Sequence, residues 1–254
     1  MDKYTYEELI RNSVYSLNRV NKTKMKPTRS NLHELITISK YMPQQTCIDI
    51  DKILLHELKH KKIFFLNELI PTKQIHKAEI YSWNGDITLL GIECIVNASN
   101  EQVLGCFIPG NKCVDNVIHT NSGPQLRNFC RDVMKNNLLG TGKVMISPAF
   151  CLPSKYIIHT VGPIIKNNNV SEIDIENLGN CYINSLNLCR LNKIKQIAFP
   201  NISTGSYDFP GDKAVHVAVI SVLFWINNNP DYQISIVFCN YTKENHRRYI
   251  KMMI

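Results

Sequence analysis

The amino-acid sequence predicts an α/β fold, with a mixed, mainly parallel sheet covered by helices on both faces. From residue 78 onward, short runs rich in β-branched residues alternate with longer segments of helical apolar spacing, a pattern typical of parallel sheets. Before residue 78 the apolar residues recur at helical spacing only, which indicates a helical N-terminal extension. The length of 254 residues is sufficient to bury a sizeable core.

The extension is predicted to consist of short helices. Helical spacing covers residues 4–20, a segment after Ser30, which can cap a helix, and residues 48–62. Because these apolar stripes need a partner surface, we expect the helices to pack on the rest of the chain. The sequence therefore divides into an extension, residues 1–75, and a main domain, residues 76–254.

In the main domain the pattern changes between strand and helix several times. The predicted strands are 80–83, 94–97, 143–147, 156–161, 196–200 and 235–239. The predicted helices are 116–137, 176–192, 211–226 and 242–253. The Asn- and Lys-rich segment 166–170 is predicted to be a surface loop.

Composition excludes several classes of protein. The 29 Lys and Arg exceed the 21 Asp and Glu, giving a net charge of +8 that favours anionic ligands. These basic residues are scattered apart from 59–62, so nucleic acid is not an expected partner. No run approaches the roughly 18 apolar residues of a membrane span, and the polar segment 1–13 does not resemble a signal peptide. Nine irregularly spaced cysteines indicate a reducing, intracellular and cytoplasmic location.

One zinc-peptidase motif is present. His56, Glu57 and His60 match H-E-x-x-H, which on a helix places two imidazoles one turn apart around a metal. A peptidase would need a third ligand, for which His76 and Glu79 are candidates. The flanking lysines favour a second interpretation, a solvent-facing helix surface.

Two strand ends carry residues suited to ligand binding. Asp86 can accept hydrogen bonds from a ligand amine, or it can cap a turn. After the strand that ends at residue 200, successive backbone N–H groups can form an anion site for a diphosphate, or the segment can be a plain strand–helix connection. The residues of this second segment are Ser203, Thr204, Gly205, Ser206 and Tyr207.

Several motifs resemble those of one family. GDIT, IVNASN, VDNVIH and ISTGSYDFP, in this order and spacing, closely resemble a macrodomain, an ADP-ribose-binding three-layer α/β/α sandwich. LGC-x6-C, LPSKYIIHTVGP and the helical extension resemble the zinc-dependent branch, which hydrolyses ADP-ribose from modified proteins. The resemblance covers residues 30 to 240 approximately.

The resemblance implies roles for individual residues. Asp86 and Ile87 match the pair that contacts adenine, and Asn100 matches a contact to the distal ribose. Asp115, preceded by the matching Val114, corresponds to the acidic residue that orients or activates water near the anomeric carbon; its alternative role is a helix N-cap. Asn100 and Asp115 are thus the catalytic candidates. Ser203 to Tyr207 match the diphosphate loop, with Tyr207 over the distal ribose.

The resemblance implies zinc as a cofactor, but with an incomplete ligand set. Cys106 and Cys113 match two of the family's three zinc ligands, whereas Asn111 stands where the third, a histidine, is expected. An amide oxygen is a poor zinc ligand beside thiolates and imidazoles. Three outcomes stay open: weaker zinc binding, substitution by another side chain, or loss of the metal.

The predicted function is hydrolytic removal of mono-ADP-ribose from modified, acidic protein side chains. The expected partners are ADP-ribose and an ADP-ribosylated protein, and the chain is expected to be a monomer without membrane association. The alternative is a module that binds ADP-ribose without turning it over.

Overall fold

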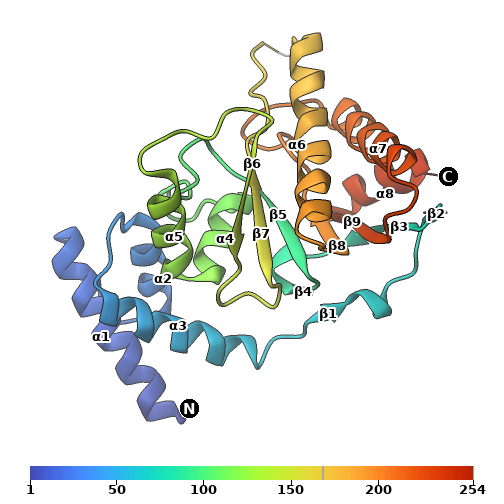
Figure 1. Ribbon diagram of the computed structural model, residues 1–254. Helices are drawn as coiled ribbons and strands as arrows, with labels where there is room; N and C mark the ends of the chain where they lie inside the picture. Colours follow the sequence, from blue (N-terminus) through green and yellow to red (C-terminus); the bar gives the residue numbers. More distant parts are fainter. Residues whose placement is uncertain (168, 254) are drawn as a thin grey trace.

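The computed structural model describes residues 1–167 and 169–253, and within them the predicted α/β fold is confirmed (Figure 1). The main sheet of these residues is mixed. Its strands lie in the order β2 (Lys73–Ile75), β3 (Ala78–Asn84), β9 (Ile234–Asn240), β8 (Gln196–Phe199), β5 (Cys94–Ala98), β7 (Tyr156–Thr160) and β6 (Val144–Pro148). All neighbours from β3 to β7 are parallel, and β2 and β6 pair antiparallel at the two edges. The ends of the parallel strands therefore meet at one edge, where ligands bind in such sheets.

Helices cover both faces of the sheet, which confirms the predicted layers (Figure 1). The helices on one face are α6 (Glu172–Leu191), α7 (Gly211–Asn228) and α8 (Lys243–Met253), and those on the other are α4 (Val114–Ser122) and α5 (Pro124–Met134). Each face has its own apolar core, the first around Tyr182 and Phe199 and the second around Ile95 and Ile118. Because both faces are covered, the central strands are almost continuously apolar.

The N-terminal extension forms an additional layer outside α4 and α5 (Figure 1). It contains α1 (Lys3–Asn21), α2 (Arg29–Ile38) and α3 (Gln44–Leu58), with α2 packed on α4 and α3 packed on α5. Its apolar stripes meet in a separate core that includes Leu17 and Leu35 and also buries Cys151 of the main domain. In the structure the extension and Cys151 thus share one apolar core.

Several short elements have no counterpart in the sequence prediction. A small parallel pair joins β1 (Phe64–Phe65) to β4 (Leu90–Gly91), and single 3₁₀ turns occupy Leu66–Glu68 and Ile87–Leu89. Elements of two or three residues are too short for a hydrophobic period to reveal them.

The predicted helix 116–137 is wrong as a single element, because it is two helices that meet at Gly123 and Pro124. Gly123 has φ +89°, and Pro124 lacks the N–H that would continue the first helix. The predicted cap at Ser30 is also wrong, since the Thr28 hydroxyl accepts the N–H of Asn31. In the predicted loop 166–170, Asn168 lies outside the described residues, and Lys166 pairs with Asn169.

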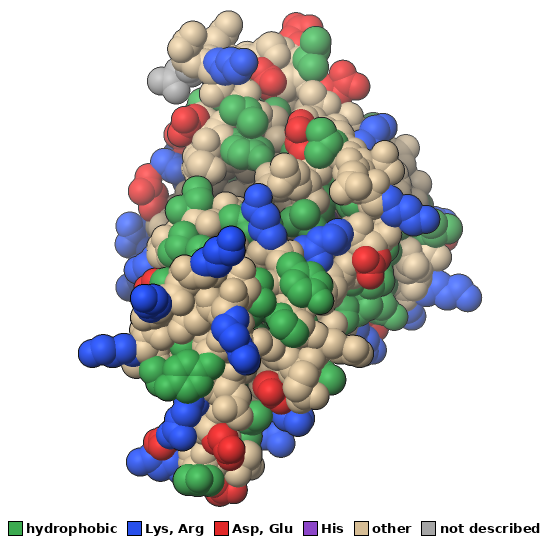
Figure 2. Space-filling view, turned by 90° about the vertical axis from the view of Figure 1, so that its left-hand side faces the viewer, with side chains coloured by type: hydrophobic (Ala, Val, Ile, Leu, Met, Phe, Trp, Pro, Cys, Tyr) green, Lys and Arg blue, Asp and Glu red, His purple; other side chains and the backbone are tan. Residues whose placement is uncertain are grey.

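Figure 2 shows the side of the molecule that carries the extension, where Lys and Arg side chains lie scattered among acidic and apolar ones. A continuous basic stripe of the kind that binds nucleic acid is not visible on this face. Among the described helices, none combines the length and the apolar character needed to cross a membrane.

Candidate active site

A pocket of about 590 Å³ opens where the parallel strands end. Its walls come from the ends of β3 and β5, the loop after β8 and the first turn of α4. All the residues singled out in the sequence as ligand contacts line this one pocket: Asp86, Ile87, Asn100, Val114, Asp115, Ser203, Thr204, Gly205, Ser206 and Tyr207. Cys106, Asn111 and Cys113 line it too. Residues as far apart in the chain as Asp86 and Tyr207 are therefore brought to one site by the sheet topology.

Sequence reasoning missed other residues of the same pocket. Gly162 follows β7, and Tyr241 and Asn245 follow β9 at the same edge of the sheet. A signal existed for Gly162 and Tyr241, because each closely follows a predicted strand at this edge of the sheet. Asn245 lies further on, in α8 (Lys243–Met253), and gave no such signal.

The loop after β8 leaves a row of backbone donors free. Its carbonyl groups are engaged, since Phe209 N–H donates to Ser203 O and Asp208 N–H donates to Gly205 O, at 2.9 and 3.0 Å. Among the described residues, by contrast, none accepts a hydrogen bond from the N–H groups of Ser203 to Tyr207. The Ser203 hydroxyl is buried and has no partner in the described chain. Such a concavity of free N–H groups suits a phosphate-type anion.

The first turn of α4 provides a second group of free backbone N–H donors beside the pocket. Val114 and Asp115 occupy that turn, where N–H groups have no acceptor within the helix. The partial positive charge of a helix N-terminus favours an anion there. Two independent donor groups therefore face the same cavity.

Asp86 performs the turn-capping role that was the alternative to ligand binding. Its Oδ1 accepts from the backbone N–H of Thr88 at 2.9 Å and from the Thr88 hydroxyl at 2.7 Å. The other carboxylate oxygen accepts from no described residue and borders the pocket, so the cap leaves one oxygen for a ligand amine.

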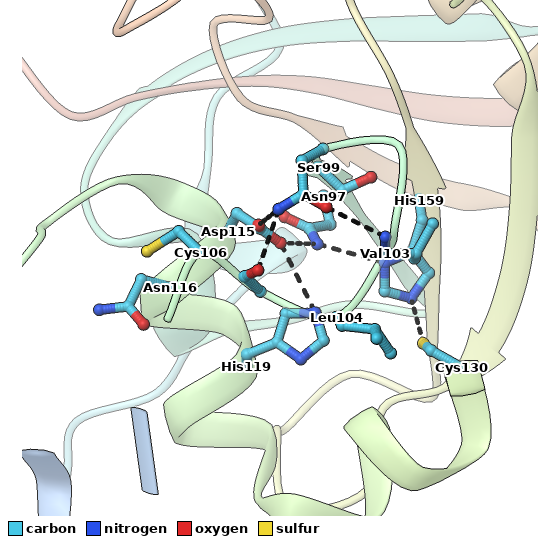
Figure 3. Close-up of polar contacts among 12 residues, drawn as sticks. Asn97, Ser99, Val103, Leu104, Cys106, Asp115, Asn116, His119, Cys130 and His159 are labelled. Carbon is cyan, nitrogen blue, oxygen red and sulfur yellow. Dashed lines mark hydrogen bonds and ion pairs between the residues drawn. The ribbon is translucent and has the colours of Figure 1, made fainter. Parts of the chain in front are cut away.

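Asp115 lies at the centre of a buried polar network (Figure 3). The residue is 5% exposed, and its Oδ1 accepts from Asn97 Nδ2 at 2.8 Å. His119 Nε2 is 3.5 Å from the same oxygen, and Asn100 Nδ2 is 3.4 Å from Oδ2. Asp115 is not the N-cap of α4, because Cys113 Sγ accepts the N–H of Asn116 in that role.

The electrostatics of the network keep both histidines neutral. Burial raises the pKa of Asp115 to about 6, although the hydrogen bond from Asn97 and the charge of Arg127 act in the opposite direction. Burial also holds the pKa of His119 well below its usual range and lowers that of His159 to about 3. The contact between Asp115 and His119 is therefore a carboxyl beside a neutral imidazole and not an ion pair.

Asn97 links Asp115 to a second strand. Its Nδ2 lies 3.2 Å from Nδ1 of His159. The other ring nitrogen of His159, Nε2, lies 2.9 Å from the Ser147 hydroxyl and 3.8 Å from Cys130 Sγ. Figure 3 shows Asn97, His159 and Cys130 in this arrangement. These groups come from β5, β7, β6 and α5, so the orientation of Asp115 depends on four elements.

Asn100 is the hub of the loop that follows β5. Its Oδ1 accepts from the N–H groups of Gln102 and Val103 at 3.0 and 3.2 Å, and its Nδ2 donates to Gly105 O at 2.9 Å. The strand-end turn, the alternative role for this residue, is thus present, and the same amide also reaches Asp115.

The residues at the family's zinc position are engaged with one another. Asn111 Nδ2 lies 3.6 Å from Cys106 Sγ, and Asn111 Oδ1 accepts the N–H of Cys113 at 3.1 Å. Burial raises the pKa of the Cys113 thiol to about 11. The described residues contain no cluster of three or more His, Cys, Asp or Glu able to hold a metal. Two thiols and an occupied amide fall short of a tetrahedral zinc site.

The structure does not support the peptidase interpretation of the H-E-x-x-H motif. Glu57 accepts from Arg29 Nε at 2.6 Å, from Arg29 Nη2 at 2.9 Å and from the Tyr6 hydroxyl at 2.6 Å, so its carboxylate is committed within the extension. α3 ends at Leu58, so His60 of the motif lies beyond the helix. Glu79, a candidate for the third ligand, accepts from the hydroxyls of Tyr81 and Ser235. The motif therefore stabilises the packing of α1 and α2 on α3.

Residues 96–218 match the family described as Macro domain. The chain is 40% identical over 205 residues to a protein-ADP-ribose hydrolase of Treponema medium, covering 80% of this chain and 78% of that protein. It is 36% identical over 202 residues to a protein-ADP-ribose hydrolase of Staphylococcus aureus (strain Mu50 / ATCC 700699), covering 79% and 74%.

Solved structures give the same family. The Oceanobacillus iheyensis macrodomain with ADP is 34% identical, with a TM-score of 0.64 over 71% of this chain and 93% of that one. The Trypanosoma brucei macrodomain in complex with ADP, at 23% identity and a TM-score of 0.65, covers 95% of this chain and 96% of that one and shows the shared fold. The matched segment, the relatives and the fold agree, and this chain is a member of the macro domain family.

Proposed function

We propose that this protein is a hydrolase that removes mono-ADP-ribose from a protein side chain. The observation that carries the proposal is the buried carboxyl of Asp115 beside a pocket with two sets of free backbone donors. The relatives at 36–40% identity over most of the chain are named protein-ADP-ribose hydrolases, which supports turnover rather than binding alone.

ADP-ribose fits the distribution of chemistry along the pocket. The free oxygen of Asp86 can accept the exocyclic amine of adenine beside Ile87. The diphosphate then lies between the N–H groups of Ser203 to Tyr207 and the first turn of α4. In this order the distal ribose, which carries the bond to the protein, is proposed to lie beside Asn100 and Asp115, which also line the pocket. A volume of about 590 Å³ is in the range of small-molecule sites.

Asp115 has the pKa of a general base for this reaction. A water held by the carboxylate attacks the anomeric carbon, its proton passes to Asp115, and the bond to the departing carboxylate breaks. The leaving carboxylate is a stable anion, so the chemistry needs a positioned water more than a strong acid. A pKa of about 6 leaves Asp115 mostly ionised near neutral pH, yet more basic than an ordinary carboxylate.

No step of this mechanism is assigned to zinc, because Asn111 already hydrogen-bonds within the loop that would hold the metal. If ligand identity is the obstacle, Asn111→His is expected to bind about one zinc per chain, and the natural sequence well below that. Elemental analysis after zinc loading and dialysis measures the difference. Asn111→His combined with Cys113→Ser is the control and should lose the metal. A full equivalent of zinc in the natural protein contradicts the expectation.

The function is tested by incubating the protein with a substrate mono-ADP-ribosylated on Asp or Glu. Free ADP-ribose is expected to appear with the natural sequence, with or without added zinc, and is measured by chromatography. Substrates linked through Ser or Arg, assayed in parallel, define the linkage. No release from any of them, combined with tight ADP-ribose binding in calorimetry, would instead identify a binding module without turnover.

The substrate is proposed to be an intracellular protein. All nine cysteines, which lie in the described part of the chain, are free thiols, and most of them are buried. A thiol-rich chain of this kind is typical of a reducing compartment.

A further inference from the structure

Arg127 is a buried cation that the proposed mechanism does not use. It lies on α5 and is 3% exposed. Its hydrogen bonds to described residues all go to backbone carbonyl oxygens: from Nη1 to Ile36 at 2.8 Å and Ser39 at 2.6 Å, and from Nε to Leu104 at 2.8 Å. Burying a guanidinium is unfavourable unless it is well satisfied, so these carbonyls are essential to its presence.

Two of the three acceptors belong to the N-terminal extension. Ile36 lies in the last turn of α2 and Ser39 is its C-cap, where carbonyl groups lack partners within the helix and the helix dipole favours a cation. Arg131, one turn further along α5, donates to the carbonyl of Lys40 in the same segment. The carbonyl oxygens at the end of α2 and just after it therefore accept hydrogen bonds from both Arg127 and Arg131 of α5.

The third acceptor belongs to the loop that reaches the active site. Gly105 follows Leu104, and a Cβ built on Gly105 would lie only 3.3 Å from Arg127 Nη2, so the loop rests on the guanidinium. The Phe107 ring stacks 4.7 Å from Arg127 Cζ. Gly105 O in turn accepts from Asn100 Nδ2, the amide that also lies 3.4 Å from Asp115. A continuous set of contacts therefore runs from α2 to the carboxyl.

We infer that Arg127 is a positioning residue that makes the N-terminal extension part of the active site. It is anchored on the carbonyls at the end of α2 and holds the loop of Asn100 and Cys106 in place beside Asp115. The inference rests on the proposed function, in which Asp115 and Asn100 act on the distal ribose. The proposed boundary at residue 75 then separates two structural layers and not two independent functions.

Arg127 also contributes a positive charge that acts on the carboxyl of Asp115. The groups around that carboxyl are His119 on its own helix, Asn97 and Asn100 from β5 and its loop, Arg127 and Cys130 from α5, His159 from β7, and Cys106, Cys113 and Tyr207 around the pocket. Burial keeps both histidines neutral, so Arg127 is the positive charge among these described groups.

The test compares Arg127→Met, Arg127→Lys and a matched control, Arg131→Met, which removes a neighbouring arginine that does not touch the loop. ADP-ribose affinity is measured by calorimetry in each folded protein, and kcat and KM are measured with the ADP-ribosylated substrate. Arg127→Met is expected to weaken ADP-ribose binding at least about tenfold, because the loop of Asn100 loses the guanidinium that holds it. Arg127→Lys should still weaken binding at least about threefold, because a single ammonium cannot replace the fork of donors.

The outcomes separate the inference from the proposed function. Natural ADP-ribose affinity in a folded Arg127→Met or Arg127→Lys protein, or equal effects of Arg131→Met, each overturn the positioning role. If Arg127→Met does not fold, the affinity of Arg127→Lys decides. ADP-ribose affinity needs no turnover, so it tests Arg127 even if the natural protein releases no ADP-ribose.

Discussion

Replacement of Asp115 by Asn is expected to lower the turnover number by about 10²- to 10⁴-fold, the usual contribution of a general base. The amide keeps the shape of the side chain and can still accept from Asn97, so ADP-ribose affinity should change little. Single-turnover release of ADP-ribose measures the turnover, and calorimetry measures the ADP-ribose affinity. Asp132→Asn, at an exposed carboxyl on α5, is the matched control and should leave both unchanged. Turnover of Asp115→Asn within about threefold of the natural protein would remove Asp115 from the mechanism.

The same substitution is expected to stabilise the protein, with a definite pH dependence. The folded pKa of Asp115, about 6, lies above the ordinary 3.8, so the folded state binds this proton more tightly than the unfolded chain does. The destabilisation by Asp115 is therefore absent below pH 3.8, grows as the pH rises from 3.8 to about 6, and is constant above that. Its full value is on the order of 3 kcal/mol.

Thermal unfolding of the natural protein and Asp115→Asn, followed from about pH 4 to pH 8, measures this effect. The advantage of the variant should increase up to about pH 6 and then level off. A melting-temperature difference that is independent of pH would show that the carboxyl is not strained by burial. Loss of activity together with a gain in stability is the combination expected of a residue kept for function.

Replacement of Gly162 by Ala is expected to weaken ADP-ribose binding by at least about tenfold, or about 1.4 kcal/mol. A Cβ on Gly162 would lie 2.0 Å from Ser203 Oγ and 2.8 Å from Ile202 Cγ2, so the loop that presents the free N–H groups must move. Ser203 already has φ +63°, a conformation with little freedom to adjust.

Calorimetry with ADP-ribose measures the loss for Gly162→Ala. The control is Gly140→Ala, whose Cβ would meet only Lys143 Cγ, at 3.6 Å, on an exposed turn. Natural affinity in a folded Gly162→Ala protein would show that the loop can shift without losing its anion site.

The places where the sequence prediction was wrong have local physical causes. The break between α4 and α5 depends on Gly123 and Pro124, a pair whose meaning was visible in the sequence but was outweighed by the helical spacing on either side. β2 was missed because three residues do not show a period. The H-E-x-x-H motif suggested a metal site for a different reason. The spacing of its residues does not show that Arg29 and Tyr6 donate hydrogen bonds to its glutamate, Glu57.

The sequence by itself determined the order of strands and helices, the helical extension and the motifs that line the pocket. Those features follow from side-chain periodicity and from residues near one another in the chain, such as Asp86 with Thr88 and Ser203 with Tyr207. Only the tertiary structure decided the state of Asp115 and the role of Arg127. The pKa of the first depends on burial beneath separate elements, and the second is held by carbonyls roughly ninety residues away along the chain. Desolvation and long-range contacts are properties of the packed molecule, so no local pattern in the chain can encode them visibly.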